Sequence, residues 1–183
     1  MALINSSYFI GEKSIPNTSY PEVAGIVSNL IAIHEKDFLI KLLGYELFKL
    51  FIAGIAVGSP DQRYLDIKNG VEFTGLDGRL KKWEGLVDAT TFKSPIADYV
   101  YYHYLRQVAN NASGVGQVQA TVENSMIVSS AKQQARSYNN MVTKCMLFVE
   151  FMQLNGSVYP EYQFQLGNID LWNLLTRVNA YNF

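Results

Sequence analysis

The stretch "AKQQARSYNNMVTKCMLFVEFMQL", residues 131–154, decides the fold class of this chain. Its apolar residues recur at intervals of three and four, the spacing that lines one face of an α-helix. Asn155-Gly156 follows at once and is a typical helix stop. The predicted apolar face consists of Ala135, Tyr138, Met141, Val142, Cys145, Phe148, Val149 and Met152. Such a long helix with one apolar face predicts a bundle of helices.

A helical pattern also fills the first third of the chain. Pro21 stands at a favoured first helical position, with Ser19 as the predicted N-cap. We expect two helices, because the apolar stripe changes phase across "HEKD", residues 34–37; one helix bent near His34 is the alternative. Residues 42–52 are apolar over most of the helix circumference, which predicts a central position for the second helix.

Shorter elements follow. "SPDQRYLDIKNG", residues 59–70, predicts a short helix that stops at Asn69-Gly70. In "VEFTGLDGRLKKWEGL", residues 71–86, Asp77-Gly78 lies between short alternating segments, which is a β-hairpin signal. Ser94-Pro95 restarts a helix that ends after residue 109, and the last helix is expected around residues 171–175.

The segment near residues 113–130 has no helical stripe, and we interpret it as a long extended arm. The chain is therefore predicted to be a single domain over residues 1–183. It is mainly α, a bundle of four to five helices with a small β-hairpin and a long extended arm. Its parts are an N-terminal arm (1–19), a helical core (20–155) and a C-terminal tail with a short helix (156–183).

Composition indicates a surface that another molecule covers. Charged residues make up only 17% of the chain, below the usual quarter, whereas aromatic residues make up 13%. The alternative is a soluble monomer with many half-exposed tyrosines. The formal net charge of −1 provides no basic field for holding nucleic acid through its phosphates.

Catalytic and cofactor motifs are missing from the sequence. The only histidines are His34 and His103, and neither has the spacing of a zinc helix or a catalytic triad. The lone Cys145 lies in an apolar helical pattern, which predicts a small buried side chain. We therefore expect no enzyme activity, no cofactor and no metal.

Targeting signals are missing as well. The sequence begins without the charged and apolar regions of a signal peptide. The longest clean apolar stretch, residues 50–58, is too short to span a bilayer. We expect synthesis in a cytoplasm and no association with a membrane.

Five segments, taken in order, resemble the head–tail connector (adaptor) proteins of tailed bacteriophages, especially those of gut Bacteroidales phages. Each segment alone is a weak signal, and the information lies in their order over roughly residues 20 to 155. The segments are "FLIKLLGYELFKLF" (38–51), "VEFTGLDGRLKKWEGL" (71–86), "SPIADYVYYHYLR" (94–106), "SGVGQVQATVENS" (113–125) and "SYNNMVTKCMLFVEFM" (137–152).

The resemblance implies a structural virion protein without turnover or cofactor. It implies a homo-oligomeric ring, often a dodecamer, that sits below the portal protein in the neck of the virion. Such a ring extends the DNA channel without sequence-specific binding and docks the tail or the next neck protein. The chain would be made in the bacterial host cytoplasm. One alternative is another phage assembly factor, such as a tail-completion or stopper protein.

The stretch "YVYYHYLRQ", residues 99–107, suggests where subunits meet. Tyr99 and His103 are expected to face the bundle with Val100 beside them. Other tyrosines cover the remaining circumference, and changing Tyr102 to Ala is expected to weaken assembly more than folding. The alternative is that every ring packs inside one fold. The predicted subunit interface comprises Trp83, Tyr101, Tyr102, Tyr104, Gly114, Gly116, Gln117, Val118, Val122 and Trp172.

An alternative of another class is a small intracellular enzyme whose site assembles from His103, Tyr102 and Glu123. A deep polar pocket around His103 would favour that alternative. A flat, tyrosine-lined face with a mobile arm would favour the connector.

Overall fold

The computed structural model describes residues 2–109, 112–113, 116–117, 130–162 and 169–179. Within them the chain is mainly helical and carries a two-stranded antiparallel hairpin, which confirms the predicted fold class. The described residues contain six α-helices, more than the four to five expected, and the two short ones, α3 (Gln62–Asn69) and α6 (Ile169–Leu175), occur where the sequence placed short helices.

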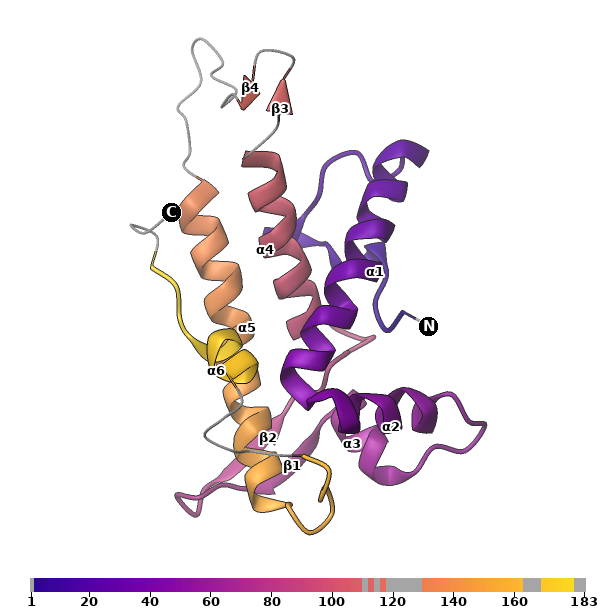
Figure 1. The fold of residues 1–183 in the computed structure, drawn as a ribbon, viewed down its shortest axis with the longest axis vertical. Helices are drawn as coiled ribbons and strands as arrows, with labels where there is room; N and C mark the ends of the chain where they lie inside the picture. Colours follow the sequence, from indigo (N-terminus) through magenta and orange to yellow (C-terminus); the bar gives the residue numbers. More distant parts are fainter. Residues whose placement is uncertain (1, 110–111, 114–115, 118–129, 163–168, 180–183) are drawn as a thin grey trace.

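Three long helices form the body of the molecule. They are α1 (Pro21–Leu43), α4 (Pro95–Ala109) and α5 (Ser130–Leu154), and α4 lies between the other two (Figure 1). The face predicted for residues 131–154 is the buried face of α5: none of its predicted residues is more than 8% exposed. The periodicity of α5 therefore identified its core side correctly.

The start of α1 differs from the prediction in its cap. Pro21 is the first helical residue, as expected, but the N-cap is Tyr20 and its side chain makes no capping hydrogen bond. Ser19 is therefore not the cap. Pro21 lacks an N–H and has a preset φ, so the helix can begin there without help from a hydroxyl.

The break between the first two helices also lies elsewhere. Helix α1 runs unbroken through residues 34–37 and ends at Gly44, which has φ 75° and ψ 156° and separates α1 from α2 (Tyr45–Ile55). The phase change at "HEKD" arises because α1 buries different faces along its length, and Glu35 is itself buried. Only glycine adopts the Gly44 conformation readily, so the chain turns there.

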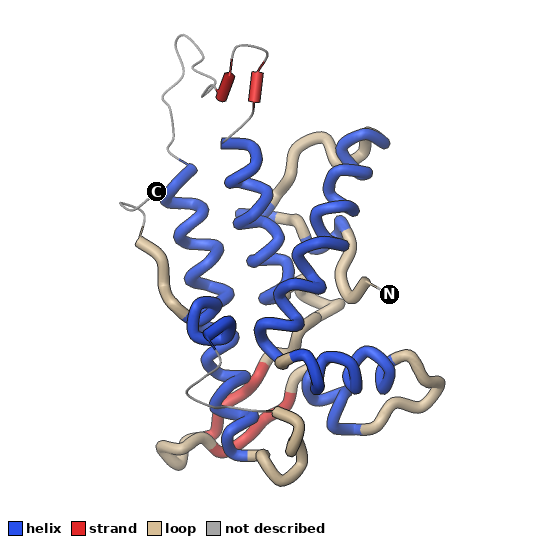
Figure 2. Tube along the Cα trace, viewed as in Figure 1, coloured by secondary structure: helices blue, strands red, loops and turns tan. Residues whose placement is uncertain are grey.

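Helix α2 is not central, contrary to the prediction. It buries Leu47, Phe51 and Ile55 but exposes Tyr45 by 63% and Leu50 by 39%. With α3 it extends sideways from the lower end of α1, away from α5 (Figures 1 and 2). Its apolar circumference therefore gives one core face and one exposed face.

The predicted hairpin is present and is anchored by its tryptophan. Strand β1 (Val71–Thr74) pairs antiparallel with β2 (Leu80–Trp83), with Val71 opposite Trp83. Trp83 is fully buried, its ring lies 5.1 Å from that of Phe148, and its Nε1–H donates to the Ile67 carbonyl at 3.0 Å. The hairpin is thus fixed to both α5 and α3.

The segment predicted as an N-terminal arm packs against the core in its described part. It forms two 3-10 turns, η1 (Ser6–Tyr8) and η2 (Gly11–Lys13). The buried carboxylate of Glu35 accepts the backbone N–H groups of Leu3 and Ile4 at 2.8 to 3.2 Å. Buried apolar side chains complete the attachment: Ile4, Tyr8, Phe9 and Ile15.

The C-terminal helix was predicted correctly and packs against α5. Leu171 and Leu174 of α6 are buried, and the Tyr138 hydroxyl donates to the carbonyls of Asn173 and Leu174 at 3.2 and 3.1 Å. Between α4 and α5, β3 (Ala112–Ser113) pairs antiparallel with β4 (Gly116–Gln117). The rest of the predicted arm lies outside the described residues.

Candidate functional site

The tyrosine-rich stretch on α4 serves mainly the interior of this chain. Tyr99 and Val100 are 4% and 0% exposed, as predicted for the bundle face. Tyr101 and Tyr102 are also buried, at 3% and 8%, while Tyr104 is half-buried. The packing of one chain therefore already accounts for the burial of Tyr101 and Tyr102, and Tyr104 retains the more accessible ring.

A polar network links α4 to α1 beside these rings. The Tyr99 hydroxyl donates to Asp37 Oδ2 at 2.8 Å, and Lys41 Nζ lies 2.7 Å from the same oxygen. Burial and the hydrogen bond to Asp37 raise the pKa of Tyr99 far above its ordinary value. Tyr99 therefore stays protonated and acts as a donor that joins two helices, a structural role.

The two histidines are neighbours in the fold. The ring of His103 stacks on that of His34, with centroids 3.9 Å apart and planes 9° apart. Tyr99 and Tyr102 meet the His103 ring edge-on at 4.6 and 5.1 Å. His103 Nε2 is buried without a hydrogen-bond partner. Among the described residues, the rings of His34, Tyr99 and Tyr102 thus pack around His103, and this environment is one of aromatic packing.

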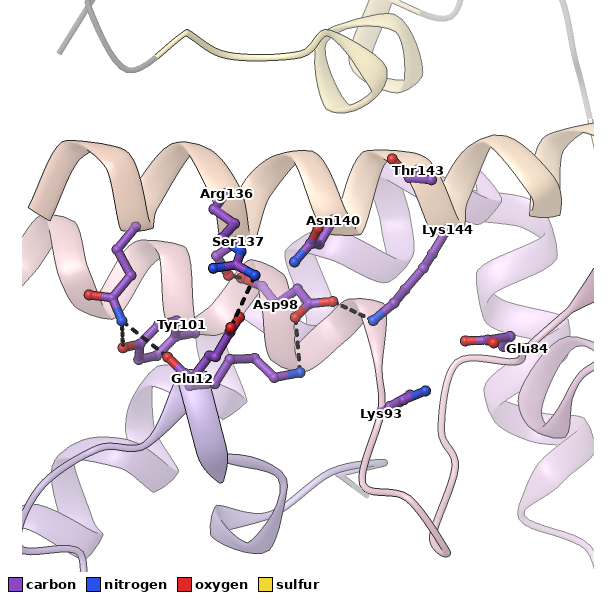
Figure 3. A pocket seen from close by; sticks show the side chains of 12 residues that line it. Glu12, Glu84, Lys93, Asp98, Tyr101, Arg136, Ser137, Asn140, Thr143 and Lys144 are labelled. Atoms are coloured by element: carbon purple, nitrogen blue, oxygen red, sulfur yellow. Dashed lines mark hydrogen bonds and ion pairs between the residues drawn. The ribbon is translucent and has the colours of Figure 1, made fainter.

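A polar pocket of about 330 Å³ lies between η2, α4 and α5 (Figure 3). Its centre is Asp98, which is 3% exposed and lies 2.9 Å from Lys13 Nζ and 2.6 Å from Lys144 Nζ. The Ser137 hydroxyl donates to the Asp98 backbone carbonyl at 2.8 Å. These contacts tie three separate elements together through one buried carboxylate.

The local sequence explains why Asp98 points there. Ser94 caps α4: its hydroxyl accepts the Ala97 N–H at 3.3 Å and donates to the Leu86 carbonyl at 2.6 Å. Asp98 then falls in the first turn of α4, where the helix dipole favours a negative charge. The ammonium groups of Lys13 and Lys144 balance the charge of Asp98, so the centre of the pocket is an ion-pair network that joins η2, α4 and α5.

The described residues include one cysteine, which is buried, and no candidate metal-binding group. Cys145 is fully buried, as predicted, with its Sγ 3.6 Å from Met141 Sδ, and burial raises the pKa of its thiol. No group of three His, Cys, Asp or Glu side chains among the described residues could hold a metal ion. Glu123, the third residue of the enzyme alternative, lies outside the described residues.

The other predicted interface residues have different positions. Trp83 is buried inside the chain, whereas Trp172 on α6 is 46% exposed. Gly116 and Gln117 form β4. Gly114, Val118 and Val122 lie outside the described residues. Among the predicted interface residues whose side chains are described, Trp172 is thus exposed and Tyr104 half-buried, whereas the others are buried.

Sequence reasoning missed two groups of residues. The first is the Asp98 network, whose only sequence signal is an acidic residue after a Ser-Pro helix start. The second is a set of exposed apolar side chains. Leu76 and Leu80 flank the hairpin turn at 71% and 74% exposure, and Ile26 and Ile33 lie on one face of α1 at 51% and 58%. Alternation marks the hairpin but does not tell which side stays uncovered.

Comparisons of this chain with known protein families, with curated proteins and with solved structures found no significant match. In the part of the chain that the structure describes, no helix is both long enough and apolar enough to cross a membrane.

Proposed function

We propose that this chain is a structural subunit of a bacteriophage neck, a head–tail connector that forms a ring below the portal protein. The ring extends the DNA channel and docks the tail or the next neck protein. The ordered resemblance of five sequence segments suggests this class of protein. The chain acts by assembly in the virion, without a cofactor and without turnover.

One structural observation carries the proposal. Large apolar side chains stay exposed at separate places on a chain whose core is already closed. They lie on α1 (Ile26 and Ile33), at the hairpin turn (Leu76 and Leu80) and on α6 (Trp172). A ring needs two different contact patches on each subunit, because each copy meets its neighbours head to tail. Separate apolar patches fit that requirement better than a single patch would.

The charge balance suits a subunit around a DNA channel. Fifteen basic residues oppose sixteen acidic ones. Binding to DNA through phosphates needs many cationic contacts, so a surface with this balance would let DNA pass rather than hold it. A near-neutral surface thus suits a channel through which DNA passes without sequence-specific binding.

The test is mass photometry of the purified chain, alone and mixed with the portal protein from the same genome, followed by negative-stain imaging. The proposal expects a ring, formed either spontaneously or only on the portal. A chain that stays monomeric and ignores the portal would contradict it. Binding to an assembled neck but not to the bare portal would indicate a stopper protein instead.

A further inference from the structure

The polar pocket between η2, α4 and α5 has more positive than negative charge in its lining. Four basic side chains line it against three acidic ones, although the whole chain carries a formal net charge of −1. Arg136 and Glu12 pair with each other in an exposed position, so their charges cancel. The excess therefore lies among the other five charged residues of the lining: Lys13, Lys93, Lys144, Glu84 and Asp98.

Two ammonium groups share one carboxylate at the centre of the pocket. Lys13 Nζ lies 2.9 Å from Asp98 Oδ1, and Lys144 Nζ lies 2.6 Å from Asp98 Oδ2. The three groups together therefore carry one positive charge. An ammonium group has three N–H donors, and a contact with one carboxylate oxygen uses only one of them. Lys13 and Lys144 thus keep donors for a further acceptor.

Lys93 and Glu84 lie at the other end of the pocket (Figure 3). Lys93 stands in the loop before α4, and Glu84 follows β2. In the part of the chain that the structure describes, neither side chain forms an ion pair. Asp88, on the same loop as Lys93, accepts hydrogen bonds from Thr90 and Thr91 instead. Counting Glu84 against Lys93, the pocket still keeps the positive charge of its centre.

The size of the pocket and the placing of its cations indicate the kind of ligand. Its volume of about 330 Å³ lies within the range of about 300–1,000 Å³ that is typical of small-molecule sites. The ammonium groups come from three places: η2, the loop before α4, and α5. A phosphate group offers three strong acceptor oxygens and up to about two negative charges, more than a carboxylate offers. Three separate ammonium groups therefore match a phosphate better than a carboxylate.

We propose that this pocket binds a small molecule through a phosphate group, which lies between the ammonium groups of Lys144 and Lys93. Asn140 lines the pocket one helical turn from Lys144 and adds an amide donor. Glu84 is the opposing charge in the wall, so it limits the affinity. This inference concerns a pocket within one chain and does not depend on the proposed ring.

The first test is a titration with inorganic phosphate that replaces chloride at constant ionic strength, followed through the amide NMR signals. Signals of residues in the pocket lining should shift and saturate. Lys93→Gln should raise the Kd for phosphate about tenfold, because it removes a charged donor. Glu84→Gln should lower the Kd, because it removes the opposing charge. Both side chains are exposed, so both variants should keep the melting temperature of the wild type.

The matched control is Lys49→Gln, which removes the same charge at an exposed position on α2 and should bind phosphate like the wild type. The absence of a saturable shift would overturn the inference. Equal Kd values for Lys93→Gln and Lys49→Gln would overturn it as well, and so would weaker binding by Glu84→Gln.

The second test compares ligands on the unchanged chain. Acetate should bind more weakly than inorganic phosphate, and glycerol phosphate should bind more tightly because it fills more of the pocket. Acetate that binds as tightly as phosphate would overturn the assignment of a phosphate group. Glycerol phosphate that binds no more tightly than inorganic phosphate would overturn the assignment of a larger phosphate-bearing molecule.

Discussion

His34 on α1 and His103 on α4 stack face to face, with their ring centroids 3.9 Å apart. Burial lowers the pKa of both rings, and that of His103 falls to about 4 because His34 and Arg106 also disfavour a second positive charge. Lys41 acts in the same direction on both rings, and Asp37 acts against it. At neutral pH both rings are therefore uncharged and serve as packing groups between two helices.

This stack predicts that stability falls with acid. The pKa of each histidine is lower in the folded chain than in the unfolded chain, so the unfolded state binds more protons as the pH falls. The contribution is complete above about pH 6.5, the ordinary histidine pKa, and is lost progressively toward the pKa of His103 in the folded chain. Thermal melts across this range should show a falling melting temperature.

His103→Phe isolates the contribution of one ring. Phenylalanine keeps an aromatic ring on His34, and the buried Nε2 of His103 gives up no hydrogen bond because it has no partner. Between about pH 7 and pH 4 the variant should lose less melting temperature than the wild type, by about 3 °C or more. Glu46→Gln, at an exposed position on α2, is the control and should follow the wild type. An unchanged slope in His103→Phe would contradict the prediction.

The Asp98 network predicts a strong effect from one buried carboxylate. Asp98→Asn leaves the ammonium groups of Lys13 and Lys144 without their counter-charge, at side-chain exposures of only 18% and 21%. We expect the free energy of unfolding to fall by about 3 kcal/mol. Urea denaturation measures this change directly.

A matched control lies in the same pocket. Arg136 pairs with Glu12 at 3.0 Å and also joins α5 to η2, but these side chains are 67% and 68% exposed. Arg136→Ala should therefore cost less than about 1 kcal/mol. Similar losses in Asp98→Asn and Arg136→Ala would show that burial does not decide the strength of these ion pairs.

Gly70 and Gly85 predict a backbone constraint at the base of the hairpin. A Cβ atom on Gly70 would lie 2.3 Å from the Trp83 carbonyl oxygen, and one on Gly85 would lie 2.5 Å from the Asn69 carbonyl carbon. Both have φ near 90°. Either change to Ala should therefore lower the free energy of unfolding by at least about 2 kcal/mol, measured by denaturation.

The control for these glycines is Gly25 in α1. A Cβ at Gly25 meets nothing within 4 Å, so Gly25→Ala should raise stability by up to about 1 kcal/mol through helix propensity. A gain in stability for Gly70→Ala as well would show that the two backbones at the hairpin base can move apart.

Apolar periodicity, helix-start residues and turn residues each predicted elements correctly. The face of α5, the Ser94-Pro95 start of α4 and the Asp77-Gly78 hairpin were all expected where they occur. Periodicity misplaced the α1–α2 break, because a buried Glu35 looks like a phase change in the sequence. The structure shows that this carboxylate faces inward to hold backbone N–H groups 31 and 32 residues away.

The polar clusters could not be predicted from the sequence, because their members are distant in the chain. His34 and His103, or Lys13, Asp98 and Lys144, are far apart in the chain, and only tertiary packing brings them together. The exposed leucines of the hairpin were hidden differently: alternation predicts two faces for a strand, but not which face the rest of the chain leaves uncovered.

Tyr102 gives the sharpest choice between the two interpretations of the tyrosine-rich stretch. The sequence suggested that Tyr102→Ala would weaken assembly more than folding. In the structure its ring lies 4.8 Å from that of Tyr138 on α5, with Arg106 over its face at 5.6 Å. The variant should therefore lower the free energy of unfolding by about 3 kcal/mol or more, as large-to-small core changes do. Tyr104→Ala, at a half-buried position, should cost less than half as much. Denaturation of both variants, with mass photometry of the same samples, separates the outcomes: a stable Tyr102→Ala monomer that fails only to assemble would restore the interface interpretation.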